Sequence, residues 1–330
     1  MLRSSAVRVG QALLTLWVTS ILVWAMLLLA PGDPARTVLA ARGVSDPPPA
    51  LIAATRRALG LSGPVVPRYW HWLERVLHGD FSTSWQTGQP VMAEFAARLP
   101  ATARLMLTAM LISILLALVL GLASAATAGS RRWSWLDRVI RLVTVLMVVT
   151  PGFLIGLFVL DILVVHLNLG QVVANGEWST VGWPATTLAI GAAGYWARVL
   201  RVSVLEARSA PYLLVSQARG ASALRRLFVH TLPNAAGPFL TVVGLGAAGL
   251  LGGAPIVETV YSWPGVGQYT VQAIDARDLP VVVTYTMLAV ATYIVASLLI
   301  DLALAAIDPR LRRQPARRTR QRLGRARAAT

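Results

Sequence analysis

The chain has 330 residues, of which 56% are hydrophobic and 13% are charged, and its mean hydropathy is +0.63. Soluble domains carry about 25% charged residues, so this composition favours an integral membrane protein over a soluble enzyme. The net charge of +16 comes from arginine without any lysine, which excludes an ATP-binding P-loop, and the absence of cysteine excludes thiolate metal sites and disulfides.

The first apolar run covers residues 7–30 and is followed by the turn sequence Pro31-Gly32-Asp33-Pro34. At about 1.5 Å per residue, this run is long enough to cross a hydrocarbon layer of about 30 Å. A secretory signal peptide is the alternative, but no small-residue cleavage site follows the run. We therefore predict that residues 1–30 form a transmembrane helix with a cytoplasmic N-terminus.

Residues 31–99 are polar enough to lie outside the membrane, and we predict an extracytoplasmic segment that contains two short helices. The first helix covers residues 50–59. The second follows Pro67, and its apolar residues recur at helical spacing: Tyr69, Trp72, Leu73, Val76 and Leu77. Such a stripe packs on the ends of the membrane spans or lies in the headgroup region.

Five further apolar runs predict five more spans, at residues 103–126, 139–166, 184 onward, 235–257 and 280–300. Pro151-Gly152 falls near the middle of the third span and predicts a kink there. Asp161 falls near the outer end of that span, where its carboxylate either lines a transport pathway or is solvated at the interface. In the fifth span, Gly249 and Gly253 form a Gly-xxx-Gly pair that allows close approach of another helix.

Six spans place both chain ends on the same side of the membrane. The short loops between spans are rich in arginine, so the positive-inside rule places these loops and both termini in the cytoplasm. The tail 308–330 is dense in arginine, which favours contact with anionic membrane lipids and requires no nucleic acid partner. The predicted fold class is therefore an all-α integral membrane protein with six transmembrane helices.

Residues 212–234, YLLVSQARGASALRRLFVHTLPN, form a polar, arginine-bearing segment between the fourth and fifth spans. The pattern predicts a short helix, a turn at Gly220 and a second amphipathic helix. Glycine adopts backbone conformations that a side chain would obstruct, and Pro233 ends a helix or begins the next one. The segment is either a rigid helix–turn–helix on the cytoplasmic face or an ordinary basic loop.

The spacing from Gly220 to Leu232-Pro233 resembles the EAA loop of binding-protein-dependent ABC importer permeases. Other motifs are similar, in the same order, to those of the dipeptide/oligopeptide/nickel permease family, first ("B") subunit. These motifs are PGDP at 31–34, LHGDF at 77–81, RLPAT at 98–102, ETVYSWPGVG at 258–267, RDLP at 277–280 and DPR at 308–310. In one departure, Leu214-Val215-Ser216 replaces the Glu-Ala-Ala for which the loop is named.

The resemblance implies a type I ABC importer permease with a transmembrane domain at 94–304 and a coupling loop at 205–234. It also implies three kinds of protein partner: a homologous second permease subunit, two ABC ATPase subunits that bind ATP and magnesium, and an extracytoplasmic solute-binding protein. Membrane lipids are a further partner, expected from the apolar spans and the arginine-rich tail. The expected ATPase-coupling residues are Tyr212, Leu213, Leu214, Ser216, Gln217, Ala218, Arg219, Gly220, Leu224, Leu232 and Pro233.

Within this expected transporter, two further sets of residues have predicted roles. Salt bridges to ATPase acids are expected from Arg219, Arg225 and Arg226, while packed apolar contacts such as Leu213, Leu214, Leu224 and Leu227 transmit the force. The external gate or binding-protein contact is expected at Glu258, Trp263, Pro264, Gly265 and Gly267.

The predicted function is a permease subunit that imports di- or oligopeptides across the cytoplasmic membrane, with ATP hydrolysed on partner subunits. A nickel or metal-chelate importer is the nearest alternative. A stand-alone secondary transporter requires several buried acids in mid-membrane, and a membrane enzyme requires a catalytic constellation; the sequence favours neither. No metal or cofactor is expected in this chain, because its histidines lack the close spacing of metal ligands: His71, His78, His166 and His230.

Overall fold

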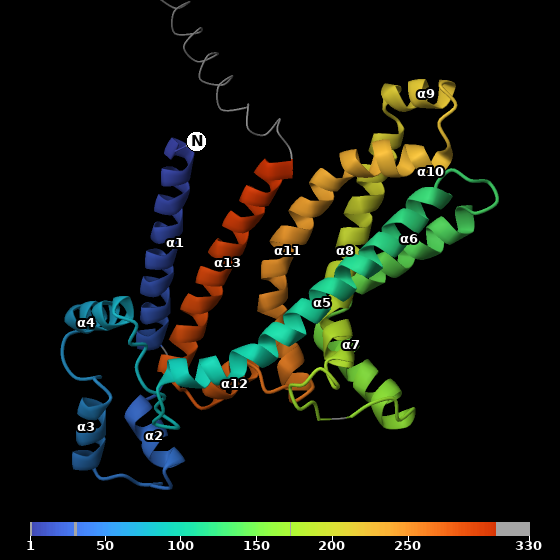
Figure 1. Cartoon of the computed structure of the whole chain (residues 1–330). Helices are drawn as coiled ribbons and strands as arrows, with labels where there is room; N and C mark the ends of the chain where they lie inside the picture. Colours follow the sequence, from blue (N-terminus) through green and yellow to red (C-terminus); the bar gives the residue numbers. More distant parts are fainter. Residues whose placement is uncertain (1, 30–31, 172, 308–330) are drawn as a thin grey trace, which may run out of the picture. The chain divides into compact units, whose positions relative to one another are not determined.

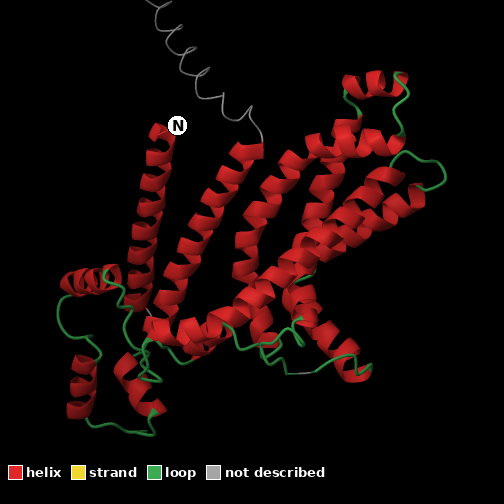
Figure 2. Ribbon diagram, viewed as in Figure 1, coloured by secondary structure: helices red, strands yellow, loops and turns green. Residues whose placement is uncertain are grey.

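The computed structural model describes residues 2–29, 32–171 and 173–307. Every regular element of these residues is helical, apart from one isolated bridge between Thr83 and Pro90 (Figure 2). The predicted all-α fold is confirmed. The predicted arginine-rich tail, residues 308–330, lies outside the described residues.

The helices are labelled in Figure 1. The first part of the chain contains α1 (Leu2–Leu29), α2 (Pro34–Ala41), α3 (Pro49–Ala58), α4 (Val65–Leu77) and α5 (Val91–Thr127). The middle contains α6 (Ser134–Val149), α7 (Gly152–Phe158), the π-helical η1 (Val159–His166) and α8 (Gly182–Arg208). The last part contains α9 (Pro211–Ala218), α10 (Ala223–Arg225), the π-helical η2 (Arg226–Thr231), α11 (Leu232–Val260), α12 (Val266–Asp275) and α13 (Leu279–Ile307).

Four helical stretches of the described chain are long and apolar enough to cross a membrane: Val91–Thr127, Gly182–Arg208, Ala223–Val260 and Leu279–Leu298. A fifth span results if α6 and the α7–η1 helix are counted together. The part of α1 with described side chains, Gly10–Ala25, is apolar but shorter than these spans. The chain therefore has four or five membrane-spanning candidates over its described residues, and the sixth span remains a prediction.

The third predicted span is broken at Pro151. Thr150 has an extended backbone, with φ −72° and ψ 123°, and α7 begins only at Gly152. A proline disfavours the helical conformation of the residue before it, so Thr150 is extended and α6 ends at Val149, two residues before Pro151. The predicted kink is thus a complete interruption of the helix.

Two compact units make up the structure. The first contains Met1–Thr108, Gly152–Thr187 and Leu251–Ile294, and the second contains Ala109–Pro151, Leu188–Leu250 and Val295–Thr330. Each unit has its own buried apolar cluster.

In the first unit, α4 packs against the end of α1 and the start of α13. Tyr69 and Trp72 of α4 are buried together with Val23 of α1 and Val283 of α13. The hydroxyls of Ser20 and Tyr69 lie 2.8 Å apart and share a hydrogen bond. The predicted apolar stripe therefore packs on the ends of the apolar helices, except for Leu77, which is 78% exposed.

In the second unit, α5, α8 and α11 contribute to one core, which consists of Ala117, Ala125, Trp196, Ala197, Leu200, Val204, Ala235, Phe239 and Val243. A Cβ atom added at Gly246 would lie 2.7 Å from Nε1 of Trp196, so α11 approaches α8 closely at this glycine. A Cβ at Gly249 would meet nothing within 4 Å. The close approach expected at Gly249 is therefore one helical turn away, at Gly246.

Candidate functional site

The predicted helix–turn–helix of residues 212–234 is present, as α9, a turn and α10–η2 between α8 and α11 (Figure 1). Gly220 has φ +78°, in the left-handed region that glycine adopts without strain. Its N–H donates to the carbonyl of Gln217 at 2.9 Å, and Ala221 N–H donates to the carbonyl of Ser216 at 3.1 Å. These two bonds form a Schellman motif, which ends α9 by pairing its last carbonyl groups.

Ser222 begins the second helix of the segment. Its hydroxyl accepts a hydrogen bond from Arg225 N–H at 3.3 Å, which is the usual contact of a helix N-cap. The turn between the two helices is thus defined at both ends by local hydrogen bonds. It is a built helix–turn–helix and not an irregular basic loop.

Residues 212–234 thus form one helix–turn–helix module, in which the π-helical stretch η2 connects α10 to α11. Pro233 is the second residue of α11, which agrees with the prediction that it begins a helix. Proline has no N–H and its ring displaces the carbonyl one turn back, so the widened turn just before it relieves that crowding. Asn234 Nδ2 donates to the carbonyl of His230 at 2.6 Å, and Thr231 Oγ1 donates to that of Arg226 at 3.1 Å.

Large apolar side chains of this module face outward. Tyr212 is 42% exposed, Leu224 69% and Phe228 63%. Leu213, by contrast, is buried and lines a cavity of about 270 Å³ between the helices of the module, together with Arg208, Gln217, Ala223, Arg226, Leu227 and Thr231. The module therefore presents an exposed apolar surface, while Leu213 and Thr231 are buried beside the cavity.

The other predicted coupling residues differ in their exposure. Gln217, Ala218, Arg219, Gly220 and Pro233 are exposed, whereas Ser216 and Leu232 are half-buried. The side chain of Leu214 lies outside the described residues. Phe228 was not among the predicted residues, and its only signal in the sequence is its place four residues after Leu224.

Three arginines of the module have no acidic partner in the described part of the chain: Arg219, Arg225 and Arg226. An unpaired arginine on an exposed apolar surface can bind a carboxylate of another protein without first breaking an internal ion pair. The module therefore combines exposed apolar side chains with unpaired arginines, of which Arg219 and Arg225 are exposed and Arg226 lines the cavity.

The end of α8, from which the module projects, is tied to α5 and α6. Arg201 donates to both carboxylate oxygens of Asp137 at 3.1 Å, and Ser124 Oγ donates to Oδ1 of the same residue at 2.6 Å. Arg208 donates to the carbonyl of Ala125 at 2.7 Å. Because bidentate guanidinium–carboxylate pairs fix geometry in two directions, this cluster holds the base of the module within its unit.

In the first unit, the 258–267 turn is built around a buried carboxyl group. Glu258 is fully buried, accepts a hydrogen bond from Thr102 Oγ1 at 2.7 Å and accepts another from Gln268 N–H at 2.9 Å. The same Thr102 hydroxyl accepts a hydrogen bond from Val266 N–H at 2.9 Å. Thr102 and Glu258 thus fix the start of α12.

The two glycines of this turn leave room for that carboxyl group. A Cβ atom at Gly265 would collide with the Glu258 carboxyl group, and one at Gly267 would lie 2.6 Å from Cα of Pro255. Trp263 is also fully buried. Of the five residues predicted for the gate or binding-protein contact, Pro264 is exposed and the other four are buried within the chain.

Asp278 is a further structural anchor that the sequence showed only as part of a motif. It is buried, and its carboxylate accepts hydrogen bonds from the Ser84 hydroxyl and from the N–H groups of Trp85 and Gln86, both at 3.1 Å. The carboxylate therefore connects the end of the 31–99 segment to the start of α13.

Asp161 lies on the π-helical η1, and its side chain is 66% exposed. Its carboxylate oxygen is 3.6 Å from Nδ1 of His166, and its backbone carbonyl is 2.8 Å from the same nitrogen. Within the described residues, no group of three or more His, Asp or Glu side chains is arranged to hold a metal ion.

Comparison with known proteins places this architecture in a family. Residues 117–313 match the family described as the binding-protein-dependent transport system inner membrane component, and residues 1–106 match the N-terminal domain of such membrane components. The glutathione transport system permease protein GsiC of Salmonella choleraesuis is 34% identical over 298 residues, which cover 90% of this chain and 95% of that protein. GsiC of Escherichia coli K12 is 32% identical over the same lengths.

Solved structures support the same fold. A chain of the inward-facing MetNI methionine ABC transporter has a TM-score of 0.57 at 18% identity, over 66% of this chain and 98% of that chain. A chain of an amino acid ABC transporter with histidines has a TM-score of 0.52 at 16% identity, over 65% and 94%. The chain therefore belongs to the binding-protein-dependent inner membrane components of ABC importers, multi-pass permease subunits whose ATPase activity resides in separate subunits.

Proposed function

We propose that this permease subunit serves an importer of di- or oligopeptides. The support is its 34% identity, over 90% of its length, to permeases of a glutathione transport system, because glutathione is itself a small peptide. The proposal has a direct test. Proteoliposomes that contain the complete transporter and its solute-binding protein should accumulate a labelled dipeptide or glutathione when ATP is supplied. Uptake of a nickel chelate with no uptake of either peptide would contradict the proposal.

The 212–234 segment is proposed as the contact with the ATPase subunits. The observation that carries this step is the exposed apolar surface of Tyr212, Leu224 and Phe228 on a module whose backbone is fixed by local caps. Exposed ion pairs contribute about 0–1 kcal/mol each, so arginines such as Arg219 orient the contact more than they hold it. Buried aromatic anchors dominate most interfaces, which favours Phe228 and Tyr212 as the principal contacts.

In the transport cycle that we propose, closure of two ATPase subunits moves this segment, and the movement passes into α8 and α11. The inward residues Leu213 and Leu227 connect the module to the rest of its unit, and the Asp137–Arg201 pair holds α8 beside it. A homologous second permease subunit would complete the transport pathway. An extracytoplasmic solute-binding protein would deliver the peptide near Pro264 and the 31–99 segment.

A substitution at Phe228 tests the ATPase contact. Because this side chain is 63% exposed, Phe228→Asp should leave the subunit folded but reduce co-purification of the ATPase subunits, by about 30-fold if Phe228 contributes the 2 kcal/mol of a typical hot spot. Ile274→Asp is the matched control, because Ile274 is 54% exposed on α12, outside the module. Equal co-purification with both variants would refute the contact.

The proposed orientation places both termini in the cytoplasm. A protease-cleavable tag inserted after Arg322 should then be cut in inside-out vesicles and protected in intact spheroplasts. Cleavage from the outside would reverse the orientation and would place the 212–234 segment on the wrong side for an ATPase contact.

A further inference from the structure

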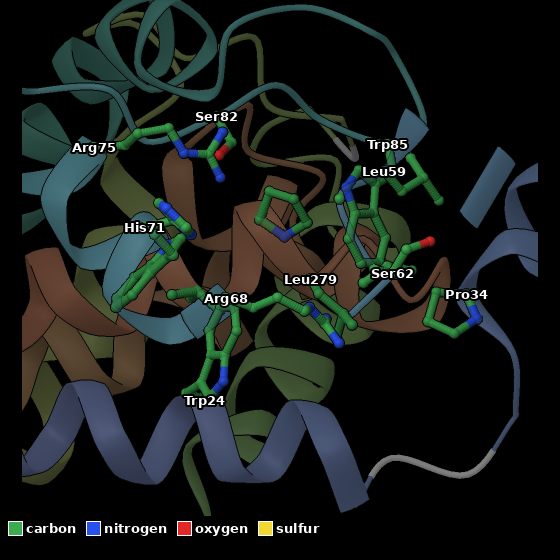
Figure 3. A pocket seen from close by; sticks show the side chains of 15 residues that line it. Trp24, Pro34, Leu59, Ser62, Arg68, His71, Arg75, Ser82, Trp85 and Leu279 are labelled. Atoms are coloured by element: carbon green, nitrogen blue, oxygen red, sulfur yellow. The ribbon is translucent and has the colours of Figure 1, made fainter. Parts of the chain in front are cut away.

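A pocket of about 400 Å³ lies within the first unit, between the end of α1, α4 and the start of α13 (Figure 3). Its size falls within the range of about 300–1,000 Å³ that is usual for small-ligand sites. Trp24, Trp72 and Trp85 form aromatic walls, and Arg68, His71 and Arg75 are the basic residues of the lining. The pocket therefore has apolar walls and basic polar groups.

The basic residues of this pocket lack acidic partners in the described chain. Arg68 and Arg75 form no ion pair there, and no Asp or Glu is among the lining residues. Other arginines of the same unit are paired: Arg56 with Asp33 at 2.9 Å, and Arg98 with Glu94. The pocket thus brings together two arginines without acidic partners, whereas Arg56 and Arg98 of the same unit have such partners.

Arg68 is the central group of the pocket, and Figure 3 shows its side chain extended across it. Its guanidinium carbon lies 5.8 Å from the centroid of the Trp24 ring. Its Nε and the indole Nε1 of Trp24 are buried and have no hydrogen-bond partner within the described residues. Burial lowers the pKa of the Arg68 guanidinium, which is the mark of a desolvated cation without a counter-charge.

Such a site favours an anion. Buried donors without acceptors cost about 1–3 kcal/mol each, so a ligand that supplies acceptor oxygens is stabilised there. Two arginines and a histidine surround a multi-oxygen anion well, since guanidinium groups bind phosphate by parallel hydrogen bonds.

The position of the pocket indicates where that phosphate comes from. Trp24 belongs to apolar α1, and Leu279 and Val283 lie in the first turns of the membrane-spanning candidate Leu279–Leu298. Tryptophans at the ends of apolar helices mark the headgroup level of a membrane. Beside the pocket, α4 exposes apolar residues that a lipid surface would cover: Val66 at 65%, Trp70 at 55% and Leu77 at 78%.

We propose that this pocket binds the phosphate group of an anionic membrane phospholipid, with Arg68 and Arg75 as the phosphate-binding groups and the tryptophans around the glycerol and first methylene groups. The bound lipid would fasten α4 to α1 and α13. It would also supply the counter-charge that the pocket lacks.

Native mass spectrometry of the full chain, purified with its partner subunits in detergent, tests the proposal. Phosphatidylglycerol should bind at least fivefold more tightly than phosphatidylcholine, because the pocket carries no acid to balance a choline group. Arg68→Gln and Arg75→Gln should each weaken phosphatidylglycerol binding about tenfold or more, the loss expected for a charged hydrogen bond. Arg57→Gln removes the same charge from an exposed, unpaired position on α3 and should leave binding within twofold.

The possible sources of the anion are separated in the same experiment. Inorganic phosphate that binds as tightly as the lipid would overturn the proposal in favour of a soluble-anion site. A dipeptide that displaces the lipid would overturn it in favour of a substrate site. Equal loss of lipid binding in Arg57→Gln and Arg68→Gln would also overturn the proposal, because the binding would then depend on net charge and not on the pocket. Arg75→Gln is included because its exposed side chain can be changed without disturbing the core, so a folding defect in Arg68→Gln cannot hide the answer.

Discussion

The Thr102 hydroxyl makes the most sharply testable contact in the 258–267 turn. It donates to Glu258 at 2.7 Å and accepts from Val266 N–H at 2.9 Å, and Thr102 is only 4% exposed. Thr102→Val keeps the shape of the side chain and removes both hydrogen bonds. A buried carboxyl group then loses one donor, and a buried N–H group loses its acceptor.

The buried N–H group left without an acceptor costs about 1–3 kcal/mol. Glu258 keeps the bond from Gln268 N–H and loses one hydrogen bond of about 1 kcal/mol, so the variant should lose about 2–4 kcal/mol of local stability around the start of α12. The chain contains no cysteine, so a single reporter, Ala273→Cys, can be placed in α12 without background. Ala273 is 4% exposed and reacts with a maleimide only when α12 opens. In the Thr102→Val background, its labelling rate should rise about 30- to 700-fold.

Thr259→Val is the matched control for this experiment. Thr259 lies next to Glu258 in sequence, but it is exposed and its hydroxyl donates only to the carbonyl of Pro255, at 2.7 Å. Its loss should change the labelling rate by less than about threefold, since exposed substitutions stay within about 0.5 kcal/mol. Equal labelling in the Thr102 and Thr259 variants would refute the view that the buried carboxyl group holds the turn.

Three other predictions follow from the second unit. Gly220→Val places a β-branched residue in the left-handed region at a cost of about 1–2 kcal/mol, so the variant should hydrolyse ATP without uptake of substrate. Gly220→Asn should retain the coupling of hydrolysis to uptake. Equal uptake by the two variants would contradict the prediction. Asp137→Asn should lower the free energy of unfolding by about 1.5–3 kcal/mol, measured by denaturation, and should be less than additive with Arg201→Gln. Gly246→Leu should lower the free energy of unfolding by about 1–3 kcal/mol through overpacking, while Gly249→Ala should leave thermal stability unchanged or higher. If Gly249→Ala were the less stable variant, the close helix contact would not lie at Gly246.

Hydrophobic runs predicted where most membrane helices lie but not where they end. The run at 103–126 belongs to α5, which begins at Val91 and continues through Pro100. A proline inside a helix usually marks a boundary, which is why the sequence suggested a later start. In the part of α5 before Pro100, Arg98 pairs with Glu94 one turn back. Arg98 also lies 4.4 Å over the Tyr269 ring of α12, a long-range contact that no local pattern reveals.

The two candidate sites differed in how far the sequence alone could describe them. The helix–turn–helix of residues 212–234 depends on contacts within a few residues, such as the bond from Ala221 to Ser216, so its turn at Gly220 was predictable. The 258–267 turn depends on Thr102, which is 156 residues away from Glu258. The burial of Glu258 could therefore not be predicted from the sequence, because a glutamate is usually exposed.

This difference also predicts how each site responds to substitution. In the 212–234 segment, the backbone caps set the shape and the large side chains point outward, so side-chain changes should alter partner binding and leave the fold intact. In the 258–267 turn, the side chain of Glu258 sets the shape and Gly265 makes room for it, so side-chain changes there should alter the fold before they alter any contact. If the 212–234 segment is the ATPase contact that we propose, it requires outward side chains on a rigid base, whereas a turn that must keep one position requires an inward anchor.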